Sequence, residues 1–304
     1  MRLCWNDWFT GPLRDLTVEE GKLIKKMGFD VAGINSGDID ATDADIDHVK
    51  GVFDTCGLIP GPYGVGRAAI HPDPAVLKKY KEELARSLKI AGKIGCTNIR
   101  ISAGSMDPDN IWKHHPDNHT QRALDLLIEH TRELLPIAED ANCIICPETT
   151  QGTIVGTVPR MKEYVERLDS PYARIVFDPV NHMGAERIYE SGRFMRCAIA
   201  SLGDCIGEIH VKDAEVKDPF IFYFGEAPMG TGTLDHEALI KASKTLEPWK
   251  TFSLEHIGYD YKNPEHYQAV KSAHDYIQGV ADRIGHTWTD PKCTRDRWLK
   301  GECR

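Results

Sequence analysis

Short runs of β-branched and apolar residues alternate along the chain with longer stretches in which apolar residues recur at helical spacing. Eight runs have the length and composition of strands: Leu3–Trp5, Val31–Asn35, Leu58–Gly61, Asn98–Ser102, Ile144–Glu148, Arg174–Asp178, Ile206–Val211 and Thr251–Glu255. Eight helical segments follow them: Thr17–Met27, Asp45–Thr55, Ala75–Ile94, Thr120–Ala141, Val158–Leu168, Glu186–Leu202, His236–Thr245 and Pro264–Ile284. Strands that alternate with helices in this way indicate a parallel sheet.

Eight strand–helix units predict an α/β protein with a closed (β/α)8 TIM barrel, and 304 residues are enough for one such barrel. No internal repeat or linker rich in Pro, Gly and Ser interrupts the series. We therefore expect a single catalytic domain over residues 1–285. Residues 286–304 have no clear periodicity and are predicted to form a C-terminal extension that packs on the barrel or contacts another subunit.

The composition is that of an ordinary globular protein, with 41% hydrophobic and 27% charged residues. A net charge of −9 disfavours nucleic acid and anionic membranes as partners. The first residues lack an apolar signal segment, and no stretch reaches the roughly 18 apolar residues of a membrane helix, so we expect a cytoplasmic protein. The nine scattered cysteines are expected to be reduced thiols. Cys143 and Cys146 face opposite sides of a strand and are expected to pack rather than bind metal.

Four successive predicted strands carry a possible metal ligand at or near their ends, namely Glu148, Asp178, His210 and Glu255. In a (β/α)8 barrel the carboxyl ends of all strands lie at one face, which is also where active sites occur. One ligand per βα unit should therefore bring the four side chains together at the barrel axis. The alternative is that they are solvated strand-end charges or internal ion pairs.

Strand alternation agrees with this placement. If Glu255 points into the barrel, then Phe252 and Leu254 point outward to the helices, as their apolar side chains require. The same alternation places Lys212 inside, where it either donates to a substrate oxygen or pairs with a carboxylate from Glu208, Asp213 or Glu215. It also places Arg100 inside, where a structural carboxylate partner is favoured over substrate contact because an unpaired buried charge is costly.

Three carboxylates and one imidazole form an oxygen-rich donor set. Such a set suits one divalent cation, with Mn²⁺ the expected ion and Mg²⁺ or Co²⁺ as alternatives. A divalent cation next to a carbonyl stabilises the enediolate that forms when a neighbouring carbon loses its proton. Such a cation therefore suits a small substrate that contains a carbonyl group.

Four motifs resemble the xylose isomerase-like TIM-barrel superfamily, in particular its branch of sugar epimerases and isomerases, which includes ketose 3-epimerases and hydroxypyruvate isomerases. The motifs are PET (Pro147–Thr149), FDPVN (Phe177–Asn181), EIHVKDAE (Glu208–Glu215) and SLEH (Ser253–His256). The resemblance implies a metal-dependent sugar epimerase or isomerase. It also implies that Glu148, Asp178, His210 and Glu255 bind the metal and that the two glutamates move protons as catalytic residues.

Two further stretches, residues 102–120 and 225–235, are similar to the catalytic subunits of C-glycoside deglycosidases, which act on 3-oxo-glycosides. This similarity implies an alternative function, a lyase that cleaves 3-oxo-glycosides by metal-assisted elimination. The chain also departs from the ketose 3-epimerases. Asn181, followed by His182, stands where those enzymes place a substrate-binding His, and an expected Arg after the metal His is missing, with Lys212 and Lys217 the nearest cations.

The candidate substrate-binding residues are Lys212, Asn181, His115, Trp112, Trp8 and Asn35. A lyase would need a further acid or base, for which His114, His115 and His119 are the candidates, although a polar capping loop is an equally ordinary role for them. Asn35 and Tyr63 are weaker candidates, placed only by their position at a strand end. Trp5, like Trp8 and Trp112, either stacks on a sugar or an aromatic aglycone or packs in the core. Gly230–Gly232 is interpreted as a turn rather than a phosphate site, because it has no Lys or Arg of its own.

We expect a homo-oligomer, or a hetero-oligomer with a small subunit if the chain is a lyase. A metal-dependent endonuclease is the alternative from another chemistry, and the acidic composition argues against it. A binding barrel without activity would not need two opposed glutamates.

Overall fold

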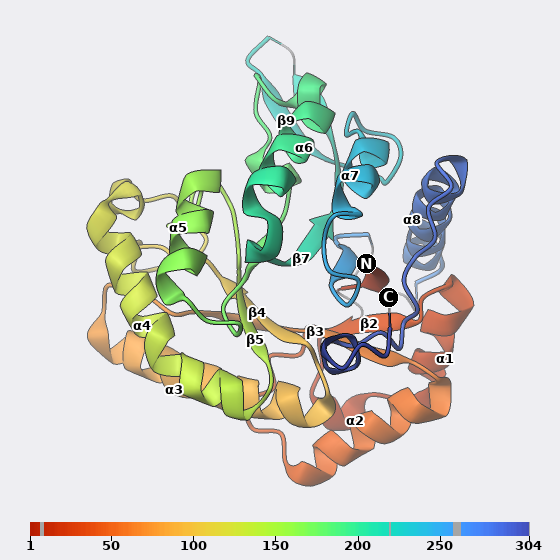
Figure 1. Cartoon of the computed structure of the whole chain (residues 1–304), viewed down its shortest axis with the longest axis horizontal. Helices are drawn as coiled ribbons and strands as arrows, with labels where there is room; N and C mark the ends of the chain where they lie inside the picture. The colour runs from red at the N-terminus through yellow and green to blue at the C-terminus, as the bar shows by residue number, and fades with distance from the viewer. Residues whose placement is uncertain (7–8, 219, 258–262, 304) are drawn as a thin grey trace.

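The computed structural model describes residues 1–6, 9–218, 220–257 and 263–303. Eight parallel strands close into a barrel in the order β1-β10-β7-β6-β5-β4-β3-β2 (Figure 1). The barrel strands are β1 (Arg2–Trp5), β2 (Val31–Ile34), β3 (Ile59–Ala68), β4 (Asn98–Ser102), β5 (Ile144–Glu148), β6 (Ile175–Phe177), β7 (Ile206–Val211) and β10 (Thr251–Leu254). The predicted (β/α)8 TIM barrel is confirmed.

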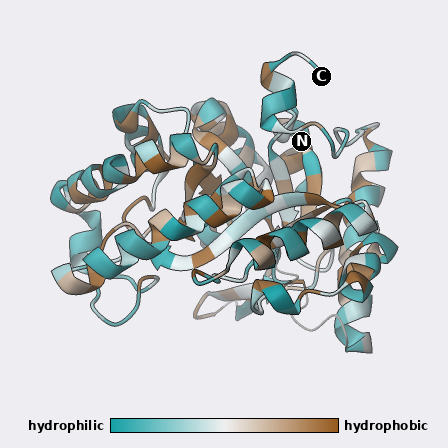
Figure 2. Ribbon diagram, turned by 90° about the horizontal axis from the view of Figure 1, so that it is seen from below, coloured by the Kyte–Doolittle hydropathy of each residue, from teal (hydrophilic) through white to brown (hydrophobic). Residues whose placement is uncertain are grey.

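The outer layer consists of helices that alternate with the strands: α1 (Val18–Met27), α2 (Asp43–Cys56), α3 (Pro74–Ile94), α4 (Gln121–Asp140), α5 (Val158–Leu168), α6 (Ser191–Leu202), α7 (His236–Ser243) and α8 (Pro264–Arg283). Thr17 begins α1 and Thr42 begins α2 with a capping box, which satisfies amide groups that the first turn leaves free. Polar and apolar residues alternate around the outer helices in Figure 2. None of the described helices is long and apolar enough to cross a membrane.

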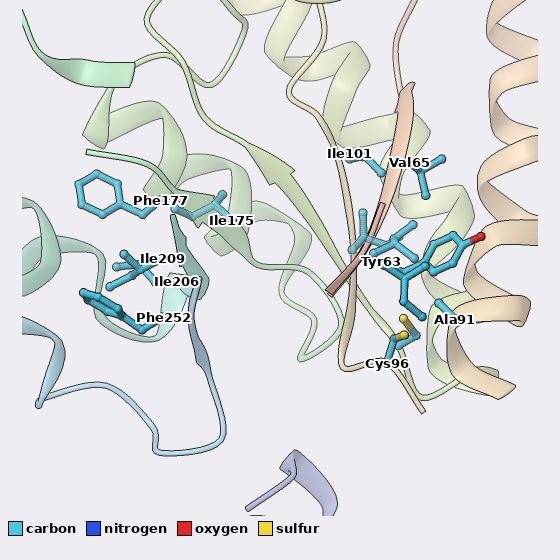
Figure 3. Packing of buried hydrophobic residues seen from close by; sticks show 14 of the residues in the cluster. Tyr63, Val65, Ala91, Cys96, Ile101, Ile175, Phe177, Ile206, Ile209 and Phe252 are labelled. Carbon is cyan, nitrogen blue, oxygen red and sulfur yellow. The ribbon is translucent and has the colours of Figure 1, made fainter. Parts of the chain in front are cut away.

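The hydrophobic core lies between the barrel and this layer of helices. Figure 3 shows buried side chains from β3, β4 and α3 on one side and from β6, β7 and β10 on the other. Phe252 and Leu254 belong to this core, as strand alternation predicts. The barrel interior is polar, and a hydrogen bond from Asn98 Nδ2 to Glu208 Oε2 (2.9 Å) joins β4 to β7 inside it.

Two element boundaries differ by several residues from the sequence expectation, and one pair of strands was not expected. Strand β3 continues to Ala68 instead of ending at Gly61, and α6 begins at Ser191, after a short 3-10 helix, instead of at Glu186. An antiparallel hairpin of β8 (Asp213–Asp218) and β9 (Tyr223–Ala227) follows β7, where the sequence pattern had predicted no strand. The hairpin projects beyond α6 and α7 (Figure 1).

The carboxylate of Asp213, at the start of the hairpin, holds the loop that follows β9. Its Oδ2 accepts hydrogen bonds from the backbone N–H groups of Gly230 and Gly232, each at 2.9 Å. An internal carboxylate therefore occupies the amides that a phosphate would need. The interpretation of Gly230–Gly232 as a turn is confirmed.

The C-terminal segment packs on the N-terminal end of the barrel, which agrees with the first of its two predicted roles. The backbone N–H of Thr289 donates to Met1 O at 3.0 Å, and Trp298 packs against a buried cluster that contains Trp249. The two ends of the chain therefore lie close together (Figure 1). The expectation that all cysteines are reduced is wrong for one pair, because Cys293 and Cys303 form a disulfide. This short extension brings the two thiols together, which scattered spacing could not reveal.

Candidate metal centre

The four predicted ligands come from four strands that follow one another in the chain. Glu148 is the last residue of β5, His210 lies in β7, and Asp178 and Glu255 directly follow β6 and β10. All four side chains are buried, and one donor atom from each lies within 4.8 Å of the others. Donors that surround one ion at roughly 2.0–2.6 Å lie at such distances from one another. The barrel thus brings together the set that the strand ends suggested.

The imidazole of His210 stands between the carboxylates. Its Nδ1 lies 2.9 Å from Glu255 Oε2, 3.5 Å from Glu148 Oε1 and 4.0 Å from Asp178 Oδ2. Among the described residues, Asp178 Oδ2, His210 Nδ1 and Glu255 Oε2 are buried without a well-directed hydrogen bond. Leaving buried polar atoms without such partners costs free energy. These atoms fit a divalent cation, which would satisfy all of them at once.

Lys212 is the cation nearest to this set. Its Nζ lies 2.8 Å from Asp178 Oδ2 and 2.9 Å from Glu255 Oε2. Burial disfavours its charged form, but the two carboxylates outweigh burial and hold the pKa of Lys212 well above its usual value. The side chain is therefore an ammonium group. Its partners are two candidate ligands and Glu226, whose Oε1 lies 3.8 Å away, whereas the structural alternative suggested by the sequence was Glu208, Asp213 or Glu215.

The two glutamates are ionised in this environment. Burial opposes ionisation of Glu255, but His210 and Lys212 hold its pKa well below the usual range. Burial and the negative charge of Glu255 act to raise the pKa of Glu148. The positive charges of His210 and Lys212 outweigh them, so the pKa of Glu148 is lowered. Each carboxylate is thus available to coordinate a cation or to accept a proton.

Behind His210, the opposite ring nitrogen faces a buried carboxylate. Nε2 lies 3.4 Å from Glu208 Oε1, and the other oxygen of Glu208 is held by Asn98. Glu208 is thus an acceptor beside Nε2, on the opposite side of the ring from the nitrogen that faces Glu148, Asp178 and Glu255. Glu208 was predicted to face inward but was given no role in the site.

Two donors also lie behind the centre. Asn6 Nδ2 is 3.1 Å from His210 Nε2 and 3.4 Å from Glu255 Oε1. Arg100 Nη1 lies 3.5 Å from the same oxygen of Glu255, so Arg100 has the carboxylate partner that the sequence analysis favoured. That partner is itself a candidate metal ligand, which connects Arg100 to the site.

A cavity of about 490 Å³ opens over the candidate ligands. Its wall includes four of the predicted site residues outside the metal set: Asn35, Trp112, Asn181 and Lys212. Asn181 donates from Nδ2 to Glu148 Oε1 at 3.1 Å, so it holds one of the two glutamates. Trp112 is 41% exposed and offers a flat apolar surface at the rim.

The remaining predicted residues lie elsewhere. His115 is not among the described residues of the cavity wall and instead begins a short 3-10 helix, where its Nδ1 accepts a hydrogen bond from the Asp117 backbone N–H at 3.2 Å. Nε2 of His114 and Nε2 of His119 lie 3.0 Å apart in the same loop. Trp8 falls outside the described residues.

Three further residues that the sequence singled out belong to the core. Trp5 and Tyr63 are fully buried, and Tyr63 Oη donates to Asp38 O at 3.1 Å. His182, which follows Asn181, is buried too, and its Nε2 lies 3.0 Å from Thr149 Oγ1. Asn181, rather than His182, therefore faces the cavity.

Sequence reasoning missed a pair of residues in the cavity wall, Glu226 of β9 and His256. His256 Nδ1 lies 2.8 Å from Glu226 Oε1. His256 has a positive φ of 55°, which is uncommon for a non-glycine residue and turns its side chain back to the site. Its position after Glu255 in the SLEH motif was a signal, but the backbone turn could not be seen in the sequence.

The fold is a closed (β/α)8 barrel, and the carboxyl ends of its strands carry a buried group of three carboxylates and one imidazole that could hold a metal ion. The family model described as "xylose isomerase-like TIM barrel" matches residues 22–277, and the chain belongs to this family. The resemblance that the motifs carried is thereby confirmed. No curated protein sequence is significantly similar to the chain.

Solved structures with the same fold include sugar epimerases. D-psicose 3-epimerase from Clostridium cellulolyticum H10, crystallised with D-tagatose, is 16% identical with a TM-score of 0.69 over 92% of this chain and 99% of that chain. The 3-keto-D-glucoside 4-epimerase of E. coli is 17% identical, with a TM-score of 0.64 over 91% and 98%. A xylose isomerase-like protein from Mycobacterium smegmatis in complex with magnesium is 18% identical, with a TM-score of 0.67 over 92% and 96%. At these identities the similarity establishes the fold.

Proposed function

We propose that this chain is a divalent-metal-dependent epimerase or isomerase that moves a proton next to the carbonyl group of a small sugar. The observation that carries the proposal is the convergence of Glu148, Asp178, His210 and Glu255, one donor atom from each within 4.8 Å of the others, under an open cavity. The names of the similar structures, which include epimerases of free ketoses and of a keto-glucoside, support the same class of reaction.

The two glutamates are suited to opposite halves of the proton transfer. They come from β5 and β10, which the barrel separates by β6 and β7, and both line the cavity. A sugar bound between them has one carboxylate on each side. One carboxylate removes a proton from the carbon, and the other takes up a proton from water and donates it to the opposite face, which inverts the carbon; the first then releases its proton to water. Return to the neighbouring carbon would make the reaction an aldose–ketose isomerisation.

Other residues of the chain would bind and orient the substrate. Lys212 is an ammonium group in the cavity wall and can donate to a substrate oxygen. Asn181 and Asn35 offer amide groups in the same wall, and Trp112 offers a surface on which a sugar ring can pack. Arg100 and Asn6 hold Glu255 from behind and fix its direction.

The ion that we propose is Mn²⁺, with Mg²⁺ or Co²⁺ as alternatives. Three carboxylates and one imidazole suit these ions, and the Mycobacterium smegmatis protein of the same fold is in complex with magnesium. When bound, a divalent cation supplies a Lewis acid that stabilises negative charge on the substrate oxygens. Glu148, Asp178, His210 and Glu255 would hold it.

A second candidate function is the lyase. The two stretches that resemble C-glycoside deglycosidase subunits, residues 102–120 and 225–235, supply Trp112 and Glu226 to the cavity wall. On a 3-oxo-glycoside, removal of the C2 proton by the same glutamates gives an enolate, and the substituent at C1 then leaves with the bonding electron pair. The small-subunit partner belongs to this alternative, whereas a homo-oligomer belongs to the epimerase. The domain limits 1–285 and 286–304 and the cytoplasmic location stay proposals.

The test is exchange of substrate hydrogen with D₂O, followed by NMR on the Mn²⁺-loaded protein. D-fructose, D-psicose and methyl 3-oxo-β-D-glucopyranoside cover the ketose and keto-glycoside classes. Epimerisation gives deuterium at one carbon together with a new epimer, and elimination gives free methanol. Protein treated with EDTA is the control and should not exchange. Failure of all three sugars to exchange in the metal-loaded protein contradicts the proposed function.

A further inference from the structure

A second cavity adjoins the metal centre. Its volume is about 410 Å³, and it lies between the end of β9, the residues after Glu255 and helix α8. It shares Lys212, Glu226, Glu255 and His256 with the first cavity, so both cavities meet at the candidate ligands. Its volume falls within the range of roughly 300–1,000 Å³ that is usual for small-molecule sites. A molecule bound at the metal centre can therefore extend in two directions.

The two cavities differ in the chemistry of their walls. Away from the shared residues, the first is lined by polar groups such as Asn35, Arg100 and Asn181 beside the apolar Val65, Ile101 and Trp112. The second has mostly apolar side chains there, and these are Ala227, Pro228, Met229, Ile257, Ala269 and Ala273. Hydroxyl groups of a sugar find partners in the first cavity, whereas an apolar group gains free energy by leaving water for the second.

Charge in the second wall restricts the occupant further. Lys212 is the one Lys or Arg among its described lining residues, and its ammonium group is held by the carboxylates of Asp178 and Glu255. Asp213 and Glu226 add negative charge to the same wall. A phosphate or carboxylate substituent would thus meet two carboxylates in the described part of this wall, where Lys212 is already paired, which is unfavourable. The apolar side chains of the wall favour an uncharged group over any charged one, because a charge loses its hydration there.

Three polar side chains stand where the two cavities meet. His256 Nδ1 lies 2.8 Å from Glu226 Oε1, and Lys212 Nζ lies 3.8 Å from the same oxygen. These polar groups can contact the oxygen that links a sugar to its substituent. Beyond them, Met229 and Ala269 lie in the wall of the apolar part.

From these observations we propose that the second cavity is a subsite for an uncharged apolar substituent attached to the sugar, about the size of one ring. The inference rests on the proposed function, because it assigns the sugar to the first cavity and to the metal centre. It narrows the substrate class from free sugars and sugar phosphates to sugar derivatives with an apolar substituent.

The test is the binding of two probes, methyl β-D-glucopyranoside and phenyl β-D-glucopyranoside, to the Mn²⁺-loaded full chain by isothermal titration calorimetry. The phenyl probe should bind about 10- to 100-fold more tightly, which is the ratio that burial of one aromatic ring gives. Ala269→Phe places a ring in the cavity from an exposed position on α8 and should bring the affinity ratio close to one. Gln268→Phe adds the same ring at the neighbouring exposed residue, outside the cavity wall, and should keep the wild-type ratio.

Equal affinities for the two probes in the wild-type protein overturn the proposal. A preference for the phenyl probe that survives Ala269→Phe overturns it too, since the ring would then bind elsewhere. Both results concern binding and do not depend on turnover. Failure of the proposed function shows separately, as absence of hydrogen exchange with D₂O in all three sugars of the panel.

Discussion

The two ends of the barrel contain buried charges that are used in different ways. At the N-terminal end, Arg2 is fully buried and donates to Trp249 O (2.8 Å), Thr97 Oγ1 (3.2 Å) and Pro291 O (3.3 Å). Lys250, also fully buried, has Glu247 at 2.9 Å. Arg2 has hydrogen-bond partners and Lys250 an ion pair, although Lys250 Nζ, like three donor atoms at the other end, lacks a well-directed hydrogen bond among the described residues. This end holds the chain together.

At the C-terminal end the buried groups converge on one point instead. The donor atoms of Glu148, Asp178, His210 and Glu255 face one another, and three of them lack a well-directed hydrogen bond within the described residues. A cavity opens over them. Charged side chains are buried at both ends of the barrel, so their burial does not by itself indicate a functional site. What indicates one is that incompletely hydrogen-bonded groups face one another under a cavity.

The largest expected effect is the loss of turnover when a glutamate at the C-terminal end can no longer carry a proton. Glu148→Gln and Glu255→Gln should each keep an amide oxygen as a weaker ligand, but an amide accepts no proton. We expect turnover to fall roughly 100- to 10,000-fold in each variant. Rates should be measured at saturating Mn²⁺, with metal content determined in parallel. Near wild-type turnover in either metal-loaded variant would exclude that glutamate as an acid or base.

The next effect separates the two ends directly, by metal affinity. His210→Ala and Asp178→Asn should weaken Mn²⁺ binding by at least about 100-fold, more than the loss of an outer hydrogen-bond partner causes. Arg2→Met should leave the Mn²⁺ affinity unchanged but lower the free energy of unfolding by about 2–3 kcal/mol, since it leaves buried carbonyl groups without their donor. Competition with a fluorescent chelator gives the affinity, and urea denaturation gives the stability. A change of affinity in Arg2→Met would remove the distinction between the ends.

The site at the C-terminal end of the barrel could be predicted from the sequence, because each residue that indicates it stands close to the end of its own strand. Each ligand stands at or next to the end of a short apolar strand, and one βα unit places the next ligand at the same face. Alternation along β10 was sufficient to turn Glu255 inward and Phe252 outward. Asn35, Trp112 and Asn181 could be assigned to the cavity wall for the same reason, since each follows a predicted strand closely or lies in the loop after it.

Features that depend on contacts between distant segments could not be predicted. The partners of Lys212 come from β6 and β10, and no spacing in the sequence indicates them. Glu226 reaches the site because an unpredicted hairpin pairs it with Ala214, and His256 because its backbone adopts a positive φ. The disulfide of Cys293 with Cys303 likewise depends on a fold of the extension that has no periodic pattern.

The smallest expected effect concerns His182, which lies at the convergent end but packs like a core residue. Burial, aided by Arg187, lowers the pKa of His182 to about 4 from its usual 6.5. The unfolded chain therefore binds a proton more readily than the folded protein between these pH values, so stability falls as the pH drops through 6.5 and levels off near 4. Between pH 7.5 and 5.5 this one residue should reduce the free energy of unfolding by about 1 kcal/mol.

His182→Gln can retain a hydrogen bond to Thr149 but does not titrate. Between pH 7.5 and 5.5 the free energy of unfolding of this variant should therefore fall by about 1 kcal/mol less than that of the wild type. Urea denaturation of both metal-free proteins at the two pH values measures the difference, and contributions from other histidines cancel. The variant should bind Mn²⁺ as the wild type does at pH 7.5, because the imidazole faces Phe177 and Thr149 and not the candidate ligands. An equal pH dependence in both proteins would show that His182 protonates without cost in the folded state. Weaker Mn²⁺ binding by the variant would instead show that His182 contributes to the metal centre and is not only a core residue.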